Sequence, residues 1–273
     1  MKNIGILGFG QMGKGIALAF LAHDYSVFVY DIKLNYIEDM QFISDKLKKI
    51  NKENNVKNLI IKTELKDFSN NDLIIEAISE DLAKKQDIIS NISKYCDNQT
   101  ILVTNTSSIS ITELAKSYKY PENFMGMHFM NPANIMPLIE GVLGEKTSEI
   151  TLNQIKEYAN SLNKTLVCLK DNPGFIVNRL LFALINEAIN LLSENITTKE
   201  DIDLAIKLGC NFPMGPLTLA DFIGLDTCLA ILDILYNDLG GRFKPNSLLK
   251  EYVLLGKLGK KTGEGFYSYG DKK

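Results

Sequence analysis

The chain has 273 residues, of which 45% are hydrophobic and 23% are charged, and its formal net charge is −3. That length allows two domains with buried cores, and the slightly acidic balance excludes the basic surface of a nucleic-acid-binding protein and gives no reason to expect a membrane as partner. The sequence begins with an apolar strand pattern rather than a signal peptide, its four cysteines are widely spaced, and its two histidines form no zinc motif. We therefore expect a cytosolic protein with reduced thiols and without a metal site.

Short apolar runs alternate with helical segments over the first two thirds of the chain. The predicted strands cover residues 3–7, 27–30, 73–78, 101–104, 124–129, 138–142 and 166–169. The predicted helices cover residues 12–22, 34–51, 82–95 and 149–162. Apolar strands that are separated by helices of this length are typical of an α/β fold, with a mainly parallel sheet that carries helices on both faces.

From Phe175 onward the pattern indicates helices and almost no strands. Residues 175–194 have apolar side chains on most faces, which predicts a deeply buried helix. The Thr-Thr-Lys-Glu sequence at 197–200 is a capping box for the next helix, and Gly209 is placed to end it. A rigid turn at 213–216 precedes two further short helices. We therefore expect two domains, a larger one over residues 1–172 and a smaller, all-helical one over residues 173–273.

A glycine-rich motif, Gly8-Phe-Gly-Gln-Met-Gly13, lies between the first predicted strand and helix. The first glycine allows the tight turn, the second admits a pyrophosphate to the backbone, and the third lets strand and helix pack closely. Asp31 closes the second strand, where its carboxylate would accept hydrogen bonds from the adenosine ribose. A glycine-rich turn that serves packing alone is the alternative, but the positions of strand, helix and acid favour a dinucleotide site. Its predicted contacts are Gly8, Gly10, Gln11, Met12, Gly13 and Asp31.

Further polar residues stand out from apolar surroundings. Residues 104–108, Thr-Asn-Thr-Ser-Ser, follow a predicted strand, and the carboxyl edge of a parallel sheet is where ligands bind. His128 and Glu140 each lie within an apolar run, and Asn178 lies on the first helix of the second domain. Structural roles are the alternatives: a core histidine, a carboxylate with a structural partner, an asparagine that joins two segments, and Ser107 as the cap of the next helix.

Together these motifs resemble the 3-hydroxyacyl-CoA dehydrogenase family. The matching segments are 8–17, 105–108, 128–132, 171–179, 213–226 and 259–267, so the resemblance covers almost the whole chain. It implies a Rossmann-type NAD-binding domain, followed by a helical domain that forms a homodimer and closes the substrate cleft. It also implies that the substrate is a short-chain acyl-CoA whose 3-hydroxyl is oxidised or formed, in the four-carbon branch of the family.

The resemblance also implies roles for individual residues. His128 would be the catalytic base and Glu140 its orienting partner, while Ser107 and Asn178 would contact the reacting end of the substrate. The further positions that match cofactor contacts in the family are Asp31, Glu80, Lys85, Ser107, Asn131 and Lys261.

The sequence departs from the family pattern between residues 34 and 62, where the helical excursion that contacts coenzyme A is shortened. Four lysines in this stretch either meet coenzyme A phosphates or form a solvated face, and we assign no coenzyme A contacts to them. Two other functions remain as alternatives: a dehydrogenase of the same architecture that acts on a sugar acid such as gulonate, and a dinucleotide-binding sensor without turnover. The intact set of His128, Glu140, Ser107 and Asn178 speaks against a sensor, which needs no base.

Overall fold

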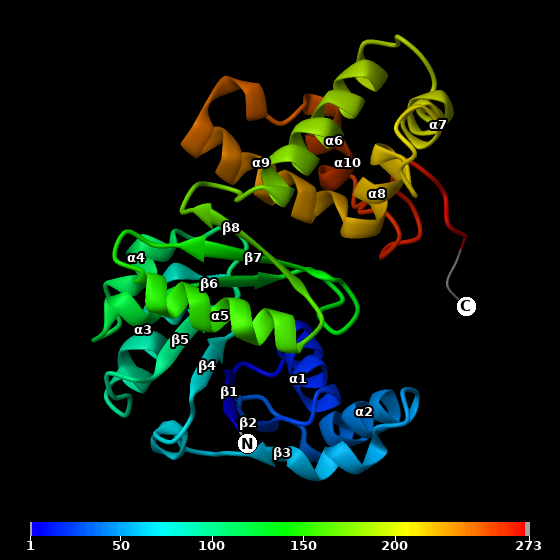
Figure 1. Cartoon of the computed structure of the whole chain (residues 1–273). Helices are drawn as coiled ribbons and strands as arrows, with labels where there is room; N and C mark the ends of the chain where they lie inside the picture. Colours follow the sequence, from blue (N-terminus) through cyan, green and yellow to red (C-terminus); the bar gives the residue numbers. More distant parts are fainter. Residues whose placement is uncertain (1, 271–273) are drawn as a thin grey trace. The chain divides into compact units, whose positions relative to one another are not determined.

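The structure, a computed structural model, describes residues 2–270 (Figure 1). Contacts within the chain divide it between Asn172 and Pro173 into two compact units, which we call the sheet unit and the helical unit. Within residues 2–270, no helix combines the length and the apolar character that crossing a membrane requires.

The sheet unit is built on one eight-stranded sheet with the order β3-β2-β1-β4-β5-β6-β7-β8. Neighbouring strands from β3 to β6 pair in parallel, β7 runs antiparallel to β6, and β8 is parallel to β7. The strands are β1 (Asn3–Leu7), β2 (Ser26–Tyr30), β3 (Leu59–Ile61), β4 (Leu73–Glu76), β5 (Ile101–Thr104), β6 (Phe124–Phe129), β7 (Leu138–Leu143) and β8 (Thr165–Lys170). This confirms the predicted α/β fold with a mainly parallel sheet, and the order of strands reverses between β1 and β4, where such sheets bind ligands.

Helices cover both faces of this sheet (Figure 1). The apolar side chains of α1, α2 and α5, among them Phe20, Ile43 and Tyr158, pack on alternate residues of the strands. The other face carries α4, whose Ile111 lies against Gly126 of β6, together with α3. The helices of the sheet unit are α1 (Gln11–Ala22), α2 (Tyr36–Lys48), α3 (Leu82–Ser93), α4 (Ile111–Ala115) and α5 (Glu149–Ser161), with 3-10 turns at Glu53–Asn58, Leu65–Phe68 and Pro121–Asn123.

Polar side chains begin most of these helices. Asn35, Asp81, Ser110 and Ser148 each accept a hydrogen bond from the backbone N–H three residues ahead, at the starts of α2, α3, α4 and α5. Such caps satisfy backbone donors that have no partner within the helix. The first residue of α1 follows Gly10, which has no side chain to donate or accept, so the backbone donors there have no side-chain cap.

Most strands and helices of the sheet unit end within one to three residues of the predicted bounds, and two differences have a local physical cause. The strand β3 was not predicted, because a run of three residues is too short to show a period. The strand predicted over 73–78 ends at Glu76, because the N–H of Ile78 donates to the Glu76 carboxylate at 2.7 Å instead of to a neighbouring strand.

The helical unit contains five α-helices and a 3-10 turn among its described residues. They are α6 (Val177–Ser193), α7 (Lys199–Gly209), α8 (Pro216–Ile223), α9 (Leu225–Leu239), the turn Gly241–Phe243 and α10 (Ser247–Leu254). Three helices follow the turn at 213–216, where two were predicted, and α9 is 15 residues long. Apolar residues of α6, α8, α9 and α10 form the core of the unit.

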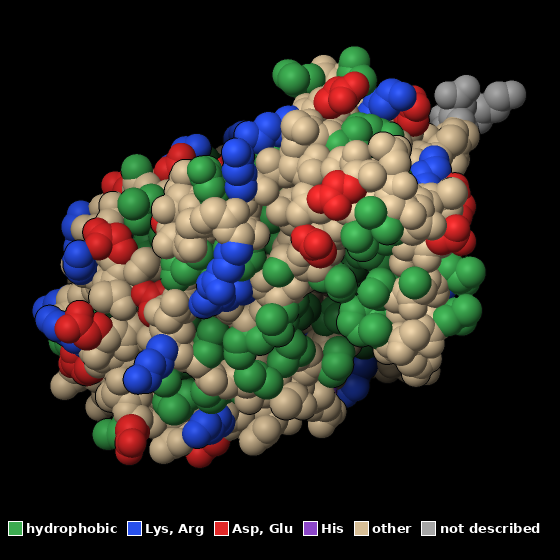
Figure 2. All heavy atoms as spheres, turned by 90° about the horizontal axis from the view of Figure 1, so that it is seen from above, with side chains coloured by type: hydrophobic (Ala, Val, Ile, Leu, Met, Phe, Trp, Pro, Cys, Tyr) green, Lys and Arg blue, Asp and Glu red, His purple; other side chains and the backbone are tan. Residues whose placement is uncertain are grey.

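Two predictions for this unit are wrong. Residues 175–194 are not deeply buried: only five of the 17 residues of α6 are buried, because its packed residues form a single stripe and side chains such as Leu180 face outward. The cap of α7 is Thr198, whose hydroxyl accepts from the Asp201 N–H at 3.2 Å, one residue later than the predicted box. The helix α7 does end at Gly209, as predicted, and the residue with a positive φ, Asn211 at 55°, follows two positions later. Hydrophobic side chains gather in contiguous groups on the face that Figure 2 shows.

Candidate active site

The glycine-rich turn joins β1 to α1 in a conformation that requires glycine. Gly8 has a φ of +99°, and a Cβ atom on it would lie 2.6 Å from the carbonyl oxygen of Ala77. A Cβ on Gly13 would collide with the carbonyl oxygen of Gly8. By contrast, a Cβ on Gly10 would meet no protein atom within 4 Å. Gly8 and Gly13 are therefore required by the fold of the turn, while Gly10 borders open space at the start of a helix, where an anion can approach the backbone.

Asp31 follows β2 and is tied to this turn. Its Oδ2 accepts a hydrogen bond from the N–H of Phe9 at 2.6 Å, and its Oδ1 accepts from the N–H of Lys33 at 2.7 Å. These two bonds fix the carboxylate beside the glycine-rich turn, and the next side chain, Ile32, is 83% exposed. Both features that the sequence singled out for a dinucleotide thus meet at the carboxyl end of β1 and β2.

His128 and Glu140 lie directly opposite each other on the antiparallel strands β6 and β7. The Nδ1 atom of His128 is 2.8 Å from Oε2 of Glu140, and the two residues are only 8% and 1% exposed. A carboxylate at Nδ1 holds the proton on that nitrogen, so that Nε2 is the nitrogen that can accept a further proton. It also stabilises the imidazolium that would form. The structure therefore brings together the two residues that the resemblance pairs as base and orienting partner.

The loop after β5 is held by one carboxylate, that of Glu80. Its Oε1 accepts hydrogen bonds from the hydroxyl of Thr106 at 2.7 Å and from the N–H groups of Ser107 and Ser108 at 2.9 and 3.0 Å. Burial would raise the pKa of the Glu80 carboxyl, but the Lys85 ammonium and these hydrogen bonds hold that pKa below its usual value. Ser107 does not cap the next helix, since Ser110 has that role in α4.

Lys85 lies beneath Glu80 and is only 1% exposed. Its ammonium donates to both carboxylate oxygens of Glu76, at 2.7 and 3.0 Å, and lies 3.5 Å from Oε2 of Glu80. Glu76 itself is fully buried at the end of β4 and was not predicted as a site residue. Its only signal in the sequence is a carboxylate that ends an otherwise apolar strand, and this pattern does not reveal the lysine nine positions later as its partner.

Two asparagines connect the loops that follow different strands. The side-chain amide of Gln11, at the start of α1, donates to the Asn131 Oδ1 atom at 3.3 Å. Asn105, after β5, accepts from the N–H of Phe129 at 2.9 Å. These bonds join the loops after β1, β5 and β6, which hold most of the predicted cofactor positions, at one edge of the sheet.

Two further predicted site residues, Asn178 and Lys261, belong to the helical unit. Asn178 lies in the first turn of α6. The ammonium of Lys261 pairs with the carboxylate of Asp226, at the start of α9. The segment that carries Lys261 is held by Asp221, which accepts from the N–H groups of Phe266 and Tyr267 at 2.9 and 2.8 Å. Burial raises the pKa of the Asp221 carboxyl.

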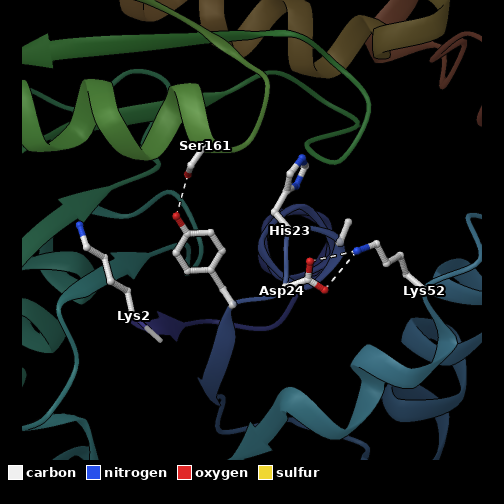
Figure 3. A pocket seen from close by; sticks show the side chains of 7 residues that line it. Lys2, His23, Asp24, Lys52 and Ser161 are labelled. Carbon is white, nitrogen blue, oxygen red and sulfur yellow. Dashed lines mark hydrogen bonds and ion pairs between the residues drawn. The ribbon is translucent and has the colours of Figure 1, made fainter.

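A surface hollow of about 590 Å³ lies at the opposite, amino ends of β1 and β2 (Figure 3). The Lys52 ammonium, which points into it, is bound to both carboxylate oxygens of Asp24 at 3.1 and 3.0 Å. The hydroxyl groups of Tyr25 and Ser161 form a hydrogen bond with each other at 2.7 Å. Lys52 and Asp24, and Tyr25 and Ser161, are thus paired with each other, and none of the predicted site residues lines the hollow.

Comparison with known proteins gives matches over almost the whole chain. The family model described as "3-hydroxyacyl-CoA dehydrogenase, NAD binding domain" matches residues 3–172, and "3-hydroxyacyl-CoA dehydrogenase, C-terminal domain" matches residues 174–269. A "Probable 3-hydroxybutyryl-CoA dehydrogenase" of Bacillus subtilis is 42% identical over 100% of this chain and 99% of its own. The 3-hydroxybutyryl-CoA dehydrogenase of Clostridioides difficile is 39% identical over 98% and 99%. The crystal structure of (S)-3-hydroxybutyryl-CoA dehydrogenase from Ralstonia eutropha superimposes with a TM-score of 0.95 at 36% identity, covering 99% of this chain and 100% of that one.

Proposed function

The chain belongs to the 3-hydroxyacyl-CoA dehydrogenase family, and from this membership we propose that it interconverts (S)-3-hydroxybutyryl-CoA and the corresponding 3-ketoacyl-CoA with NAD(H). The observation that carries the proposal is the buried pair of His128 and Glu140, 2.8 Å apart. A histidine with its proton fixed on Nδ1 by a carboxylate is well suited to accept a proton from a hydroxyl group at Nε2.

In the oxidation direction, Nε2 of His128 accepts the proton of the 3-hydroxyl as the hydride leaves C3. Glu140 stabilises the imidazolium that results, and in reduction the imidazolium returns the proton to the ketone oxygen. NAD, when bound, accepts or supplies the hydride. Ser107 and Asn178 contact the reacting end of the substrate. The contribution of the protein is therefore to position the hydroxyl and to hold one proton.

The structure offers a suitable cradle for NAD. The open space beside Gly10 at the start of α1 would accommodate a pyrophosphate, and Gly8, Gln11, Met12 and Gly13 are its other proposed contacts. Asp31 binds the hydroxyls of the adenosine ribose. Toward the nicotinamide end, the proposed contacts are Glu80, Ser107, Asn131 and Lys261. Lys85, also expected at the cofactor, acts in this proposal through Glu80, because its ammonium is buried against Glu76.

Reduction of acetoacetyl-CoA, followed by the loss of NADH absorbance, tests this function. The shortened excursion between residues 34 and 62, which contains α2, and the relatives named for hydroxybutyryl-CoA favour a four-carbon acyl group. We therefore expect a higher kcat/KM for acetoacetyl-CoA than for the ten-carbon 3-ketoacyl-CoA. A preference for the ten-carbon substrate would contradict the assignment. Oxidation of gulonate with NAD, in a preparation inactive on acetoacetyl-CoA, would favour the sugar-acid alternative.

We also propose that the protein is a homodimer that forms through the helical unit. Side chains on three of its helices are exposed although they are apolar: Leu180 of α6 is 68% exposed, Leu208 of α7 75% and Leu254 of α10 87%. Exposed apolar surface of this kind is stabilised when a second copy covers it. Light scattering at micromolar concentration should give the mass of two chains, and a monomeric mass would refute the proposal.

The remaining partners follow from the same activity. The proposed substrate is an acyl-CoA, and the proposal includes no nucleic acid or membrane as partner. All four cysteines, Cys96, Cys168, Cys210 and Cys228, are free thiols, which fits a reducing compartment, and we propose that the enzyme acts in the cytoplasm.

A further inference from the structure

The carboxylate of Glu76 is fully buried at the carboxyl end of β4 and is saturated with donors. Its Oε1 accepts from the N–H of Ile78 and from the Lys85 ammonium, each at 2.7 Å. Its Oε2 accepts from the Thr104 hydroxyl at 2.6 Å and from Lys85 at 3.0 Å. Removing a carboxylate and an ammonium from water is costly, and an apolar pair of similar volume would stabilise a sheet end at least as well. The ion pair therefore calls for an explanation beyond stability.

Two chains of contacts lead from Glu76 to the same residue, Thr106. In the first, the Thr104 hydroxyl that donates to Glu76 also accepts the N–H of Thr106 at 3.2 Å. In the second, Lys85 lies between Glu76 and Glu80, and Glu80 accepts the Thr106 hydroxyl at 2.7 Å. Thr106 is thus held at both its main chain and its side chain by a closed ring, which we call the Glu76 ring: Thr106, Thr104, Glu76, Lys85 and Glu80.

Ser107 follows Thr106 directly, and its N–H donates to Glu80, a member of the ring. We propose that Glu76 is a positioning residue, which through this ring fixes the loop after β5 and so places Ser107 for the substrate. The inference rests on the proposed function, because Ser107 has a substrate only if the chain is a dehydrogenase. A charge at Glu76 suits this role, since the same carboxylate polarises the Thr104 hydroxyl and anchors the ammonium that orients Glu80.

Thr104→Val removes the hydroxyl that links Glu76 to Thr106, while the side chain stays β-branched and uncharged. Thr100→Val makes the same substitution outside the ring and is the matched control. Both threonines are buried; Thr104 ends β5, Thr100 directly precedes it, and the Thr100 hydroxyl donates to Asp97 at 3.0 Å, away from the ring. We expect Thr104→Val to lower kcat/KM by about 10–100-fold, as the loss of supporting contacts around a site does, while Thr100→Val stays close to the wild type. Thr104→Ser, which keeps the hydroxyl, should restore most of the activity.

Thr106→Val interrupts the ring at a second position, because it removes the hydroxyl that donates to Glu80 and leaves the ion pair of Glu76 and Lys85 intact. Amide hydrogen exchange supplies a readout that needs no substrate. In Thr104→Val and Thr106→Val, the N–H groups of Ser107 and Ser108 should exchange faster, while those of β1 and β4 keep their protection.

Several outcomes would overturn the inference. One is a Thr104→Val or Thr106→Val enzyme with nearly wild-type kcat/KM, and another is an equal loss in Thr104→Val and Thr100→Val, which indicates general destabilisation. If the wild type does not reduce acetoacetyl-CoA, the proposed function fails. The exchange measurement still tests whether the Glu76 ring fixes the loop after β5. Unchanged exchange at Ser107 and Ser108 would then show that the ring does not fix the loop.

Discussion

His128→Gln is expected to lower kcat by a factor of about 10²–10⁴, which is the usual contribution of a general acid–base residue. Binding of NADH should be almost unchanged, because the glycine-rich turn joins β1 to α1 and Asp31 follows β2, whereas His128 and Glu140 lie on β6 and β7. Steady-state kinetics with acetoacetyl-CoA and titration of NADH fluorescence measure the two effects separately. A folded His128→Gln enzyme with nearly normal kcat would end the proposal that His128 is the base.

The partner of the base gives a control on this result. Glu140→Gln should also slow turnover, since it removes the charge that stabilises the imidazolium 2.8 Å away. The double variant should be far less impaired than the product of the two single losses, because residues that act as a unit are not additive. In the pH profile of kcat/KM for oxidation, the limb that reports the histidine should vanish in His128→Gln. If His128 were only a core residue, folding, cofactor binding and turnover would be lost together.

The preference for NAD(H) over NADP(H) should be the second large effect. Two backbone hydrogen bonds, from Phe9 and Lys33, hold the Asp31 carboxylate in place, so it cannot turn away from a 2′-phosphate. A close contact between like charges costs several kcal/mol, so kcat/KM with NADH should exceed that with NADPH by about 100-fold or more. Equal or better kcat/KM with NADPH would contradict the assignment.

Lys33 is the cation nearest in sequence that could compensate for the 2′-phosphate. Asp31→Ser should reduce the ratio of kcat/KM with NADH to that with NADPH, since it removes the repulsion between the carboxylate and the 2′-phosphate but keeps a polar side chain. Lys33→Gln should leave the preference for NADH unchanged or increase it. A large loss of NADH binding in Lys33→Gln would show instead that the cation, rather than Asp31, determines which cofactor binds.

The sequence alone determined the class of fold and the position of the glycine-rich turn. The ranges Asn3–Leu7, Ile101–Thr104 and Phe124–Phe129 agree with the predicted strands, because strands that are buried on both faces must be continuous apolar runs. The turn could be recognised because each glycine has a local task, and two of these tasks are visible in the positive φ of Gly8 and the close approach at Gly13.

The local sequence was a poorer guide to the burial and the exact start of helices in the helical unit, which depend on neighbouring elements and on the backbone conformation. The apolar residues of 175–194 suggested a deeply buried helix, yet most residues of α6 are only partly buried or exposed, because an apolar side chain is buried only if another element lies over it. The cap of α7 lies one residue after the predicted one, because Thr197 and Thr198 are equally suitable cap residues and only the backbone conformation determines which of them acts as the cap.

Only the tertiary structure decided how the site residues meet. An apolar run predicts a strand but not its direction, and it is the antiparallel pairing of β7 with β6 that sets Glu140 opposite His128. The pairing of Glu76 with Lys85 likewise needs α3 to pack beside the end of β4, which no period in the sequence encodes. The chemistry of each side chain is a local property that the sequence carries, whereas the distance between two of them depends on strand register and helix packing, which are set by contacts across the whole sheet.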